Sequence, residues 1–353
     1  MTDLLPTELQ KAIEALRRNE FNKTNTAKEL GIPRSTLRDR LASAERQGAD
    51  IWGASFDVTQ EAKGHQDLEE LKERRRKEWQ RKKSSTPEIL NVSVKLDGPI
   101  GLLFMGDPHV DDPGTNFPLL ERHVEIINRT PALFAANLGD ISNNWIGRLA
   151  SLYEHQATTS AEAWQLTEWL VTAVDWLYIV GGNHDLWSGS GDPIKWMVQN
   201  SNTVYRAHQV RIAMNFPNGK EVRVNTRHDF PGHSMWNTVH GLVKAATMGH
   251  RDHILAAGHK HTSGYGMVKD PLTGLISHVV RCAGYKELDE YAAKLGLSDV
   301  NMFPSSVAII NPEYDDSDPR LVTMFFEPEA AADYLTWLRK KSKSANTPSK
   351  SRT

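Results

Sequence analysis

Five short polar motifs, each placed directly after an apolar run, constrain the fold of this sequence more than any other feature. The motifs are GDPH (106–109), GD (139–140), GGNHD (181–185), RHD (227–229) and GHKH (258–261). Most of the runs before them, such as IGLLFM and HILAA, have the length and composition of buried strands, and they alternate with amphipathic stretches as in an α/β domain. Because open α/β sheets gather ligand groups at the carboxyl ends of their strands, we expect the motifs to meet at one site.

The polar residues of these motifs are types that bind divalent metal ions. In chain order the candidate ligands are Asp107, His109, Asp140, Asn183, His228, His259 and His261. Each motif alone also has an ordinary interpretation, since a Gly-Asp pair is a common turn and an Asp-x-His pair is often a surface or core pair. The whole set, each member at a strand end, favours a metal site. Imidazole, carboxylate and amide ligands without thiolate favour Mn, Fe or Zn over Cu or an iron–sulfur cluster.

The order of the motifs resembles the calcineurin-like metallophosphoesterase family, whose pattern runs D-x-H, G-D, G-N-H-[D/E], H and G-H-x-H. The matching segment spans residues 102–261. The resemblance implies an α/β fold, a two-sheet α/β/β/α sandwich with two divalent metal ions at the strand ends, Mn²⁺ first and Fe, Zn or Ni as alternatives. By position, it implies one ion at Asp107, His109 and His261, a second at Asn183, His228 and His259, and Asp140 as the bridge between them.

The same resemblance assigns catalytic roles beside the metal ligands. His184 follows the expected ligand Asn183, and the family uses this residue as a general acid or electrostatic stabiliser at the leaving-group oxygen. Asp185 is expected to orient the His184 ring. The family often has a further acid after the G-D motif, whereas this chain has Ser142, Asn143 and Asn144, and we expect Asn143 to take over a supporting role.

Two of the ligand assignments have competitors in the sequence. The family usually places a glycine after the fourth-motif histidine, but here Asp229 follows His228, and His233 is an alternative ligand. His228 is preferred because it directly ends a strand. His250 follows a glycine and imitates the last motif, but GHKH (258–261) is preferred because a continuous apolar strand precedes it.

The first fifty residues predict a small all-α domain. Amphipathic patterns indicate a helix from residue 7, a second over 26–30 and a third over 33–43. The segment TAKELGIPRSTLRDRL (26–41) resembles the helix-turn-helix of Fis-type and related bacterial and phage DNA-binding proteins. The resemblance implies that the third helix enters the major groove with four residues near DNA: Arg34, Ser35, Thr36 and Arg38. The alternative is a helical bundle for self-association or protein docking.

Net charge differs between the expected segments of the chain. We expect a helix-turn-helix domain over 1–50, a charged helical linker over 51–90, the metallophosphoesterase domain over 91–338 and a basic disordered tail over 339–353. Residues 1–90 have net charge +2, residues 91–338 net −10 and residues 339–353 net +6. Basic ends suit a polyanionic partner, and an acidic body suits bound cations. The basic helix expected over 63–83 either follows phosphates or is a solvated spacer.

Several classes of protein are excluded at this stage. The sequence has no run of about 18 apolar residues and its start has no basic or apolar signal region, so we expect neither a membrane span nor secretion. A single cysteine, Cys282, excludes an internal disulfide and a cysteine-based zinc cluster and suits a cytoplasmic protein. Trp145, Trp187 and Trp236 follow three motifs, where they either stack on bases or serve packing.

Together these features predict a two-metal phosphoesterase whose DNA-binding head points to nucleic acid as the substrate. The expected activity is phosphodiester hydrolysis, as in the SbcD-like nuclease branch of the family. The alternatives are a phosphomonoesterase or small-nucleotide phosphodiesterase, and a DNA-binding regulator or assembly factor with a secondary phosphoesterase body. The N-terminal region is also a candidate for homo-oligomer or protein contacts.

Overall fold

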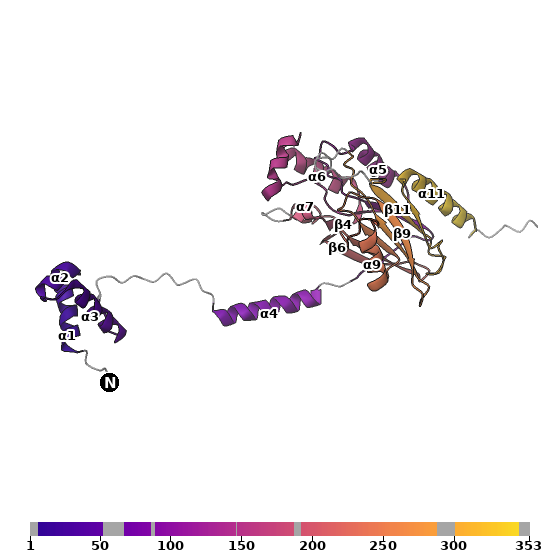
Figure 1. Cartoon of the computed structure of the whole chain (residues 1–353). Helices are drawn as coiled ribbons and strands as arrows, with labels where there is room; N and C mark the ends of the chain where they lie inside the picture. The colour runs from indigo at the N-terminus through magenta and orange to yellow at the C-terminus, as the bar shows by residue number, and fades with distance from the viewer. Residues whose placement is uncertain are drawn as a thin grey trace, which may run out of the picture. The chain divides into compact units, whose positions relative to one another are not determined.

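The computed structural model describes residues 6–51, 67–85, 89–145, 147–186, 192–287 and 301–345. The chain divides into two compact units, Met1–Ser85 and Thr86–Thr353 (Figure 1). Parts of the expected linker and tail, and Trp187, lie outside the described residues. No helix among the described residues is long and apolar enough to cross a membrane.

The first unit begins with three helices around one apolar core. They are α1 (Thr7–Arg18), α2 (Lys23–Glu29) and α3 (Arg34–Arg46), and their core includes Leu16, Leu37 and Leu41. The second helix begins earlier than the sequence predicts, because the Asn22 side chain accepts the free N–H groups of the first turn. Between α2 and α3, Gly31 has a φ of +63°, a conformation that favours glycine.

Helix α4 (Leu68–Ser85) also belongs to the first unit and is covered with charge. Ion pairs three residues apart join Lys72 to Glu69, Arg75 to Glu78 and Arg76 to Glu73. Pairs at this spacing lie on one face of a helix and stabilise it weakly. These ion pairs therefore stabilise the helix to a small extent, and most of its surface stays solvated.

The second unit contains two six-stranded sheets in its described part. Sheet A has the order β1 (Leu90–Ser93), β6 (Gln209–Asn215), β7 (Glu221–Arg227), β8 (Ile254–Ala257), β10 (Ile276–Arg281) and β9 (Gly264–Lys269). Sheet B has the order β12 (Val322–Phe325), β11 (Ser305–Ile310), β2 (Ile100–Met105), β3 (Leu133–Asn137), β4 (Trp176–Gly181) and β5 (Val204–Ala207).

Helices cover the outer faces of the two sheets. Against sheet B lie α5 (Phe117–Arg129), α6 (Ser160–Ala173), α8 (Pro193–Met197) and α11 (Pro328–Ala345), and against sheet A lies α9 (His240–Met248) (Figure 1). Two short elements complete the unit: η2 (Gly147–His155) and α7 (Asn183–Leu186).

Alternation along the strands builds two apolar layers. In β2, Leu102 and Phe104 face sheet A, whereas Leu103 and Met105 pack under the helices of the other face. Both faces of this strand are buried, which explains its continuous apolar sequence. The expected two-sheet α/β/β/α sandwich, preceded by a small helical domain, is confirmed.

Strand direction decides where the motifs meet. Strands β2, β3 and β4 are parallel neighbours in sheet B, and β7 and β8 are parallel neighbours in sheet A. A motif follows each of these five strands, so all five motifs leave their sheets at carboxyl ends. The sandwich thereby places the loops of both sheets next to one another at one edge.

Candidate metal centre

The seven expected ligands lie together at this edge of the sandwich. Ligand atoms within 4.8 Å of one another form three overlapping groups: Asp107, His109 and His261; His109, Asp140 and His184; and Asp140, His228 and His259. Asp140 and His109 each belong to two groups, so the clusters form one continuous centre.

The first group combines one carboxylate with two imidazoles. His109 Nε2 lies 3.1 Å from His261 Nε2, which lies 3.5 Å from Asp107 Oδ2. Asp107 Oδ1 and His109 Nδ1 are buried without a hydrogen-bond partner. Two ring nitrogens at this distance, beside a buried and underused carboxylate, need a shared cation or proton between them. The group fits a divalent ion.

The second group is arranged around the Nε2 atom of His228. This atom lies 2.9 Å from Asn183 Oδ1, 3.1 Å from His259 Nδ1 and 3.0 Å from Asp140 Oδ2. On the other side of the ring, Nδ1–H donates to the Leu138 carbonyl at 2.8 Å. A backbone carbonyl that receives one ring N–H leaves the other nitrogen available as a ligand, as in many metal sites.

Asp140 lies between the two groups, because its carboxylate is within 4.8 Å of ligand atoms of His109 and also of His228 and His259. Its Oδ1 accepts the backbone N–H of His184 at 2.8 Å, while Oδ2 faces His228 and lies 3.9 Å from His184 Nε2. A Cβ atom added at Gly182 would lie 2.1 Å from Asp140 Oδ1, so only glycine permits this approach. Gly139, the residue before Asp140, has a φ of +104° and likewise leaves no room for a Cβ atom.

Four of the candidate ligands have a strained backbone conformation. Non-glycine residues with positive φ include His109 (41°), Asp140 (52°), His259 (70°) and His261 (47°). Such conformations cost free energy and persist where the surrounding structure demands them, most often at functional sites. Four candidate ligands in one cluster thus hold their side chains in place at the cost of an unfavourable backbone conformation.

Burial and mutual proximity shift the pKa values of the cluster. Burial raises the pKa of Asp107 to about 6, although the neighbouring imidazoles oppose this. Burial alone would lower the pKa of His228, but the Asp140 carboxylate raises it to about 10. Burial and the neighbouring imidazoles hold the pKa of His109 well below its usual value. Burial also lowers the pKa of His259, to about 4. His109 and His259 are thus neutral near pH 7, whereas His228 holds a proton that pairs with Asp140 and that a bound cation would displace.

His184 and Asp185 lie in the same centre but have different partners from those expected. The His184 ring donates from Nδ1 to the carbonyl oxygen of Asn143. The Asp185 carboxylate instead accepts the backbone N–H groups of Asp140, Ile141 and Gly182 at 2.8, 3.0 and 2.9 Å. These contacts connect the second and third motifs, whereas the orientation of the His184 ring depends on Asn143.

The competing histidines lie elsewhere. His233 is exposed in the loop after β7, whereas His228 is buried. His250 is exposed, and the buried His253 accepts the backbone N–H of Arg223. Trp145 packs edge-on against His184, with ring centres 5.1 Å apart, while Trp236 is 95% exposed. Cys282 is buried and its pKa is raised by burial to about 12, so it offers no thiolate.

Arg281 was not anticipated from the sequence as part of this region. It is fully buried and donates to the carbonyl oxygens of Thr238 and Gly258 and to the Asp229 carboxylate. It therefore ties the fifth motif to the loop that follows the fourth. The available signal was a charged residue at the end of the apolar run ISHVVR (276–281).

The four head residues expected near DNA lie at the beginning of α3. Arg34, Ser35 and Arg38 are exposed and Thr36 is half-buried. Leu37, between them, belongs to the helical core. This half of α3 therefore presents polar and cationic side chains to solvent.

Comparison with known proteins gives one match to a family model. Residues 9–43 match the bacterial regulatory protein, Fis family. This match covers the helical head and leaves the sandwich unassigned. No curated protein matches the chain.

Comparison with solved structures gives similarities of low identity. A calcineurin-like phosphoesterase, YfkN from Bacillus subtilis, is 13% identical with a TM-score of 0.37, over 70% of this chain and 97% of that one. NAD nucleotidase from Haemophilus influenzae is 10% identical with a TM-score of 0.37, over 64% and 49%. A 5'-nucleotidase from Candida albicans is 14% identical with a TM-score of 0.30, over 69% and 58%. The fold assignment rests on the sheets and strand order described above.

Proposed function

We propose that this protein is a two-metal phosphodiesterase that acts on DNA. The observation that carries the proposal is the convergence of seven candidate ligands from five strand ends, with Asp140 within reach of His109 on one side and of His228 and His259 on the other. We assign one divalent ion to Asp107, His109 and His261 and the other to Asn183, His228 and His259, with Mn²⁺ as the first choice. When bound, such ions polarise a phosphate ester and lower the pKa of a water molecule.

The chain itself contributes orientation and electrostatics around the ester. His184 is fixed by the Asn143 carbonyl and by its own backbone N–H bond to Asp140. Its Nε2 is directed into the cluster, where it is suited to stabilise charge or deliver a proton at the leaving oxygen. Asp185 acts through the backbone: by accepting three N–H groups it holds the Asp140 turn against the Gly182 turn.

DNA is proposed as the substrate because of the head. The Fis-family match and the exposed cations Arg34 and Arg38 support a DNA contact by α3. Ser35 and Thr36 lie on the same part of the helix. A module that binds DNA raises the local concentration of phosphodiesters at the tethered centre.

A substrate panel tests the proposal. Full-length protein with Mn²⁺ is assayed on bis-p-nitrophenyl phosphate, p-nitrophenyl phosphate, single- and double-stranded DNA, and RNA, each with an EDTA-treated control. We expect hydrolysis of the small diester and of DNA, lost with EDTA and restored by Mn²⁺. Activity confined to the monoester would instead identify a phosphatase, and DNA binding without hydrolysis in any divalent metal would identify a regulator.

A further inference from the structure

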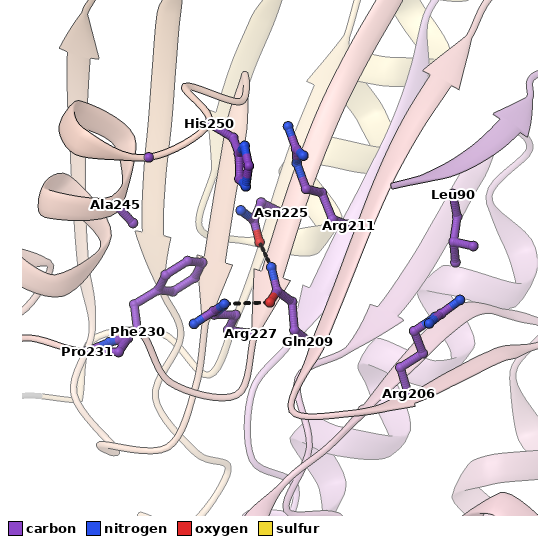
Figure 2. Close-up of a pocket in the computed structure, with 11 residues that line it drawn as sticks. Leu90, Arg206, Gln209, Arg211, Asn225, Arg227, Phe230, Pro231, Ala245 and His250 are labelled. Carbon is purple, nitrogen blue, oxygen red and sulfur yellow. Dashed lines mark hydrogen bonds between the residues drawn. The ribbon is translucent and has the colours of Figure 1, made fainter. Parts of the chain in front are cut away.

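A polar cavity of about 440 Å³ opens on the outer face of sheet A. Figure 2 shows its lining, which combines three arginines with two amides and one histidine: Arg206, Arg211, Arg227, Gln209, Asn225 and His250. Apolar residues of β1, of α9 and of the loop after β7 complete the wall. None of the lining residues, all of which belong to the described part of the chain, carries a carboxylate.

Strand alternation puts the polar groups of β6 and β7 on the outer face of sheet A. Val210, Ile212, Val222 and Val224 face the core between the sheets, so their neighbours along β6 and β7 face outward. In the register of the two strands, Gln209 is opposite Arg227 and Arg211 is opposite Asn225. The cavity is therefore a regular feature of the sheet surface.

The arginines differ in how their charge is balanced. Arg211 is paired with the buried Asp252 at 2.8 and 2.9 Å. Arg227 donates to the neutral Gln209 amide at 2.5 Å and lies 5.6 Å from the centre of the Phe230 ring. No carboxylate contacts Arg206 or Arg227 within the described residues. Two uncompensated guanidinium groups thus face one cavity of a domain whose net charge is −10 over residues 91–338.

One of these arginines precedes a candidate ligand in the chain, and the other lies on the strand beside β4, which leads into a candidate ligand. Arg227 is the last residue of β7 and directly precedes His228. Arg206 on β5 is opposite Val180 on β4, the strand that leads into Asn183. Because alternate residues of a strand point to opposite faces, His228 faces the metal centre while Arg227 faces the cavity. The cavity is therefore adjacent to the catalytic edge.

We propose that this cavity binds backbone phosphate of a nucleic acid strand whose scissile bond lies at the metal centre. The inference rests on the proposed phosphodiesterase function and identifies a contact of that site with its substrate. Arginine forks match phosphate oxygens, and the Gln209–Asn225 amides hold Arg227 in place. Contacts of this kind are independent of base sequence. They would offset the repulsion between a polyanion and the acidic body.

The test compares two double variants with a matched control in the full-length protein. Arg206→Gln with Arg227→Gln removes the two charges, and Arg206→Lys with Arg227→Lys keeps them. Arg122→Gln with Arg320→Gln removes two charges elsewhere on the body, where both arginines pair with acids. Binding of a labelled single-stranded oligonucleotide is measured by anisotropy in EDTA over a salt series, and hydrolysis of bis-p-nitrophenyl phosphate is measured with Mn²⁺.

We expect the glutamine variant to bind the oligonucleotide about tenfold or more weakly. The slope of log affinity against log salt should fall by about 1.4, since each phosphate contact on a single strand contributes about 0.7. The lysine variant should keep most of this slope, because a point charge still contacts phosphate. The control variant and the hydrolysis of the small diester should stay within about twofold of wild type.

Wild-type affinity and slope in the glutamine variant would overturn the proposal, as would an equal loss in the control. Equal loss of small-diester hydrolysis in the glutamine and lysine variants would mean that the arginines are structural. Binding of a mononucleotide that depends on Arg206 and Arg227, without an effect on the oligonucleotide, would make the cavity a nucleotide site. A wild-type protein that hydrolyses no ester would refute the proposed function, while the binding series would still decide on the cavity.

Discussion

The head and the sandwich treat charge in opposite ways. In residues 6–51 the helices pack on aliphatic side chains such as Leu16 and Leu37, and the cations Arg34 and Arg38 stay in solvent. In the sandwich, Asp107 and Asp140 are at most 1% exposed. A buried carboxylate is costly unless it is paired or binds a cation. The head can therefore act through its exposed surface alone, whereas the buried carboxylates of the sandwich need bound cations to balance their charge.

The two sheets make a second contrast within the sandwich. The edge that carries His228 gathers carboxylates, an amide and imidazoles, while the outer face beginning at Arg227 gathers guanidinium groups. Neighbouring residues of the chain thus face a cluster of candidate metal ligands and a cavity lined by arginines.

The largest effect is expected for Asp140→Asn. Loss of the shared carboxylate leaves two cations without the anion between them, and their repulsion at short range should empty at least one site. We expect hydrolysis of bis-p-nitrophenyl phosphate to fall at least about 10³-fold. Asp333→Asn, an exposed acid on α11, is the matched control and should retain full activity. Wild-type turnover in the Asp140 variant would remove this residue from the bridging role.

A smaller loss is expected for His184→Ala. The ring faces the cluster from a position beside a candidate ligand, so its removal should lower kcat by about 10²–10³-fold while metal content stays unchanged. His233→Ala, at an exposed histidine of the neighbouring loop, should be silent in the same assay. Parallel loss of metal and activity in the His184 variant would make His184 a ligand and would require a new assignment of its group.

The sequence predicts those parts of the site that depend on where strands end, and it does not predict contacts with backbone groups. Asp107, Asp140 and His228 could be placed together because each ends a strand of recognisable composition, and parallel strands end at one edge. The partner of the His184 ring could not be predicted, since it is a backbone carbonyl of Asn143, and a carbonyl carries no sequence signature. For the same reason the backbone contacts of Asp185 were unexpected.

The sequence of β7 contains a pattern that points to the arginine-lined cavity, but the motifs alone do not reveal it. Along β7 the arginines at 223 and 227 alternate with apolar or small residues, which is the pattern of an outward-facing row. What the sequence does not contain is the pairing of β7 with β6, which brings Gln209 beside Arg227. In the head, by contrast, helix periodicity and the Pro33 signal predicted the third helix to within a few residues, because those interactions are local.

Deletion of residues 1–85 tests the contrast between head and sandwich directly. The boundary follows the division of the structure, and it preserves β1, which begins at Leu90. The truncated protein should hydrolyse bis-p-nitrophenyl phosphate within about twofold of wild type. Its KM on long DNA at moderate salt should rise about tenfold or more, because the deletion removes the cations of α3 and α4 and leaves a body of net negative charge. Circular dichroism checks that the fragment folds. Equal losses on both substrates would mean that the head has a structural role.

The smallest effect concerns acid stability, to which buried His123 contributes. Burial lowers its pKa to about 4, and the hydroxyl groups of Tyr285 and Ser305 lie 2.7 and 3.1 Å from its Nδ1. Its unfolded pKa is near 6.5, so the unfolded chain binds the proton first. Its contribution is present above pH 6.5 and is lost as the pH falls toward 4, by about 2–3 kcal/mol. Residues 1–50 contain no histidine, so this dependence belongs to the sandwich.

Urea unfolding at several pH values between 7 and 4 measures this loss. His123→Asn should flatten the dependence in that window relative to wild type, whereas His240→Asn, at an exposed histidine, should not change it. An unchanged slope in the His123 variant would show that this histidine does not stay neutral in the folded protein.

The metal content of the purified protein decides whether the five strand ends hold two metal ions with Asp140 between them. Wild type, Asp140→Asn and Asp333→Asn are equilibrated with Mn²⁺, freed of excess metal and analysed by plasma mass spectrometry. We predict two ions per chain in wild type and in Asp333→Asn, and fewer than two in Asp140→Asn. Two ions in Asp140→Asn together with full activity, or no bound ion in wild type with any divalent metal, would contradict the account.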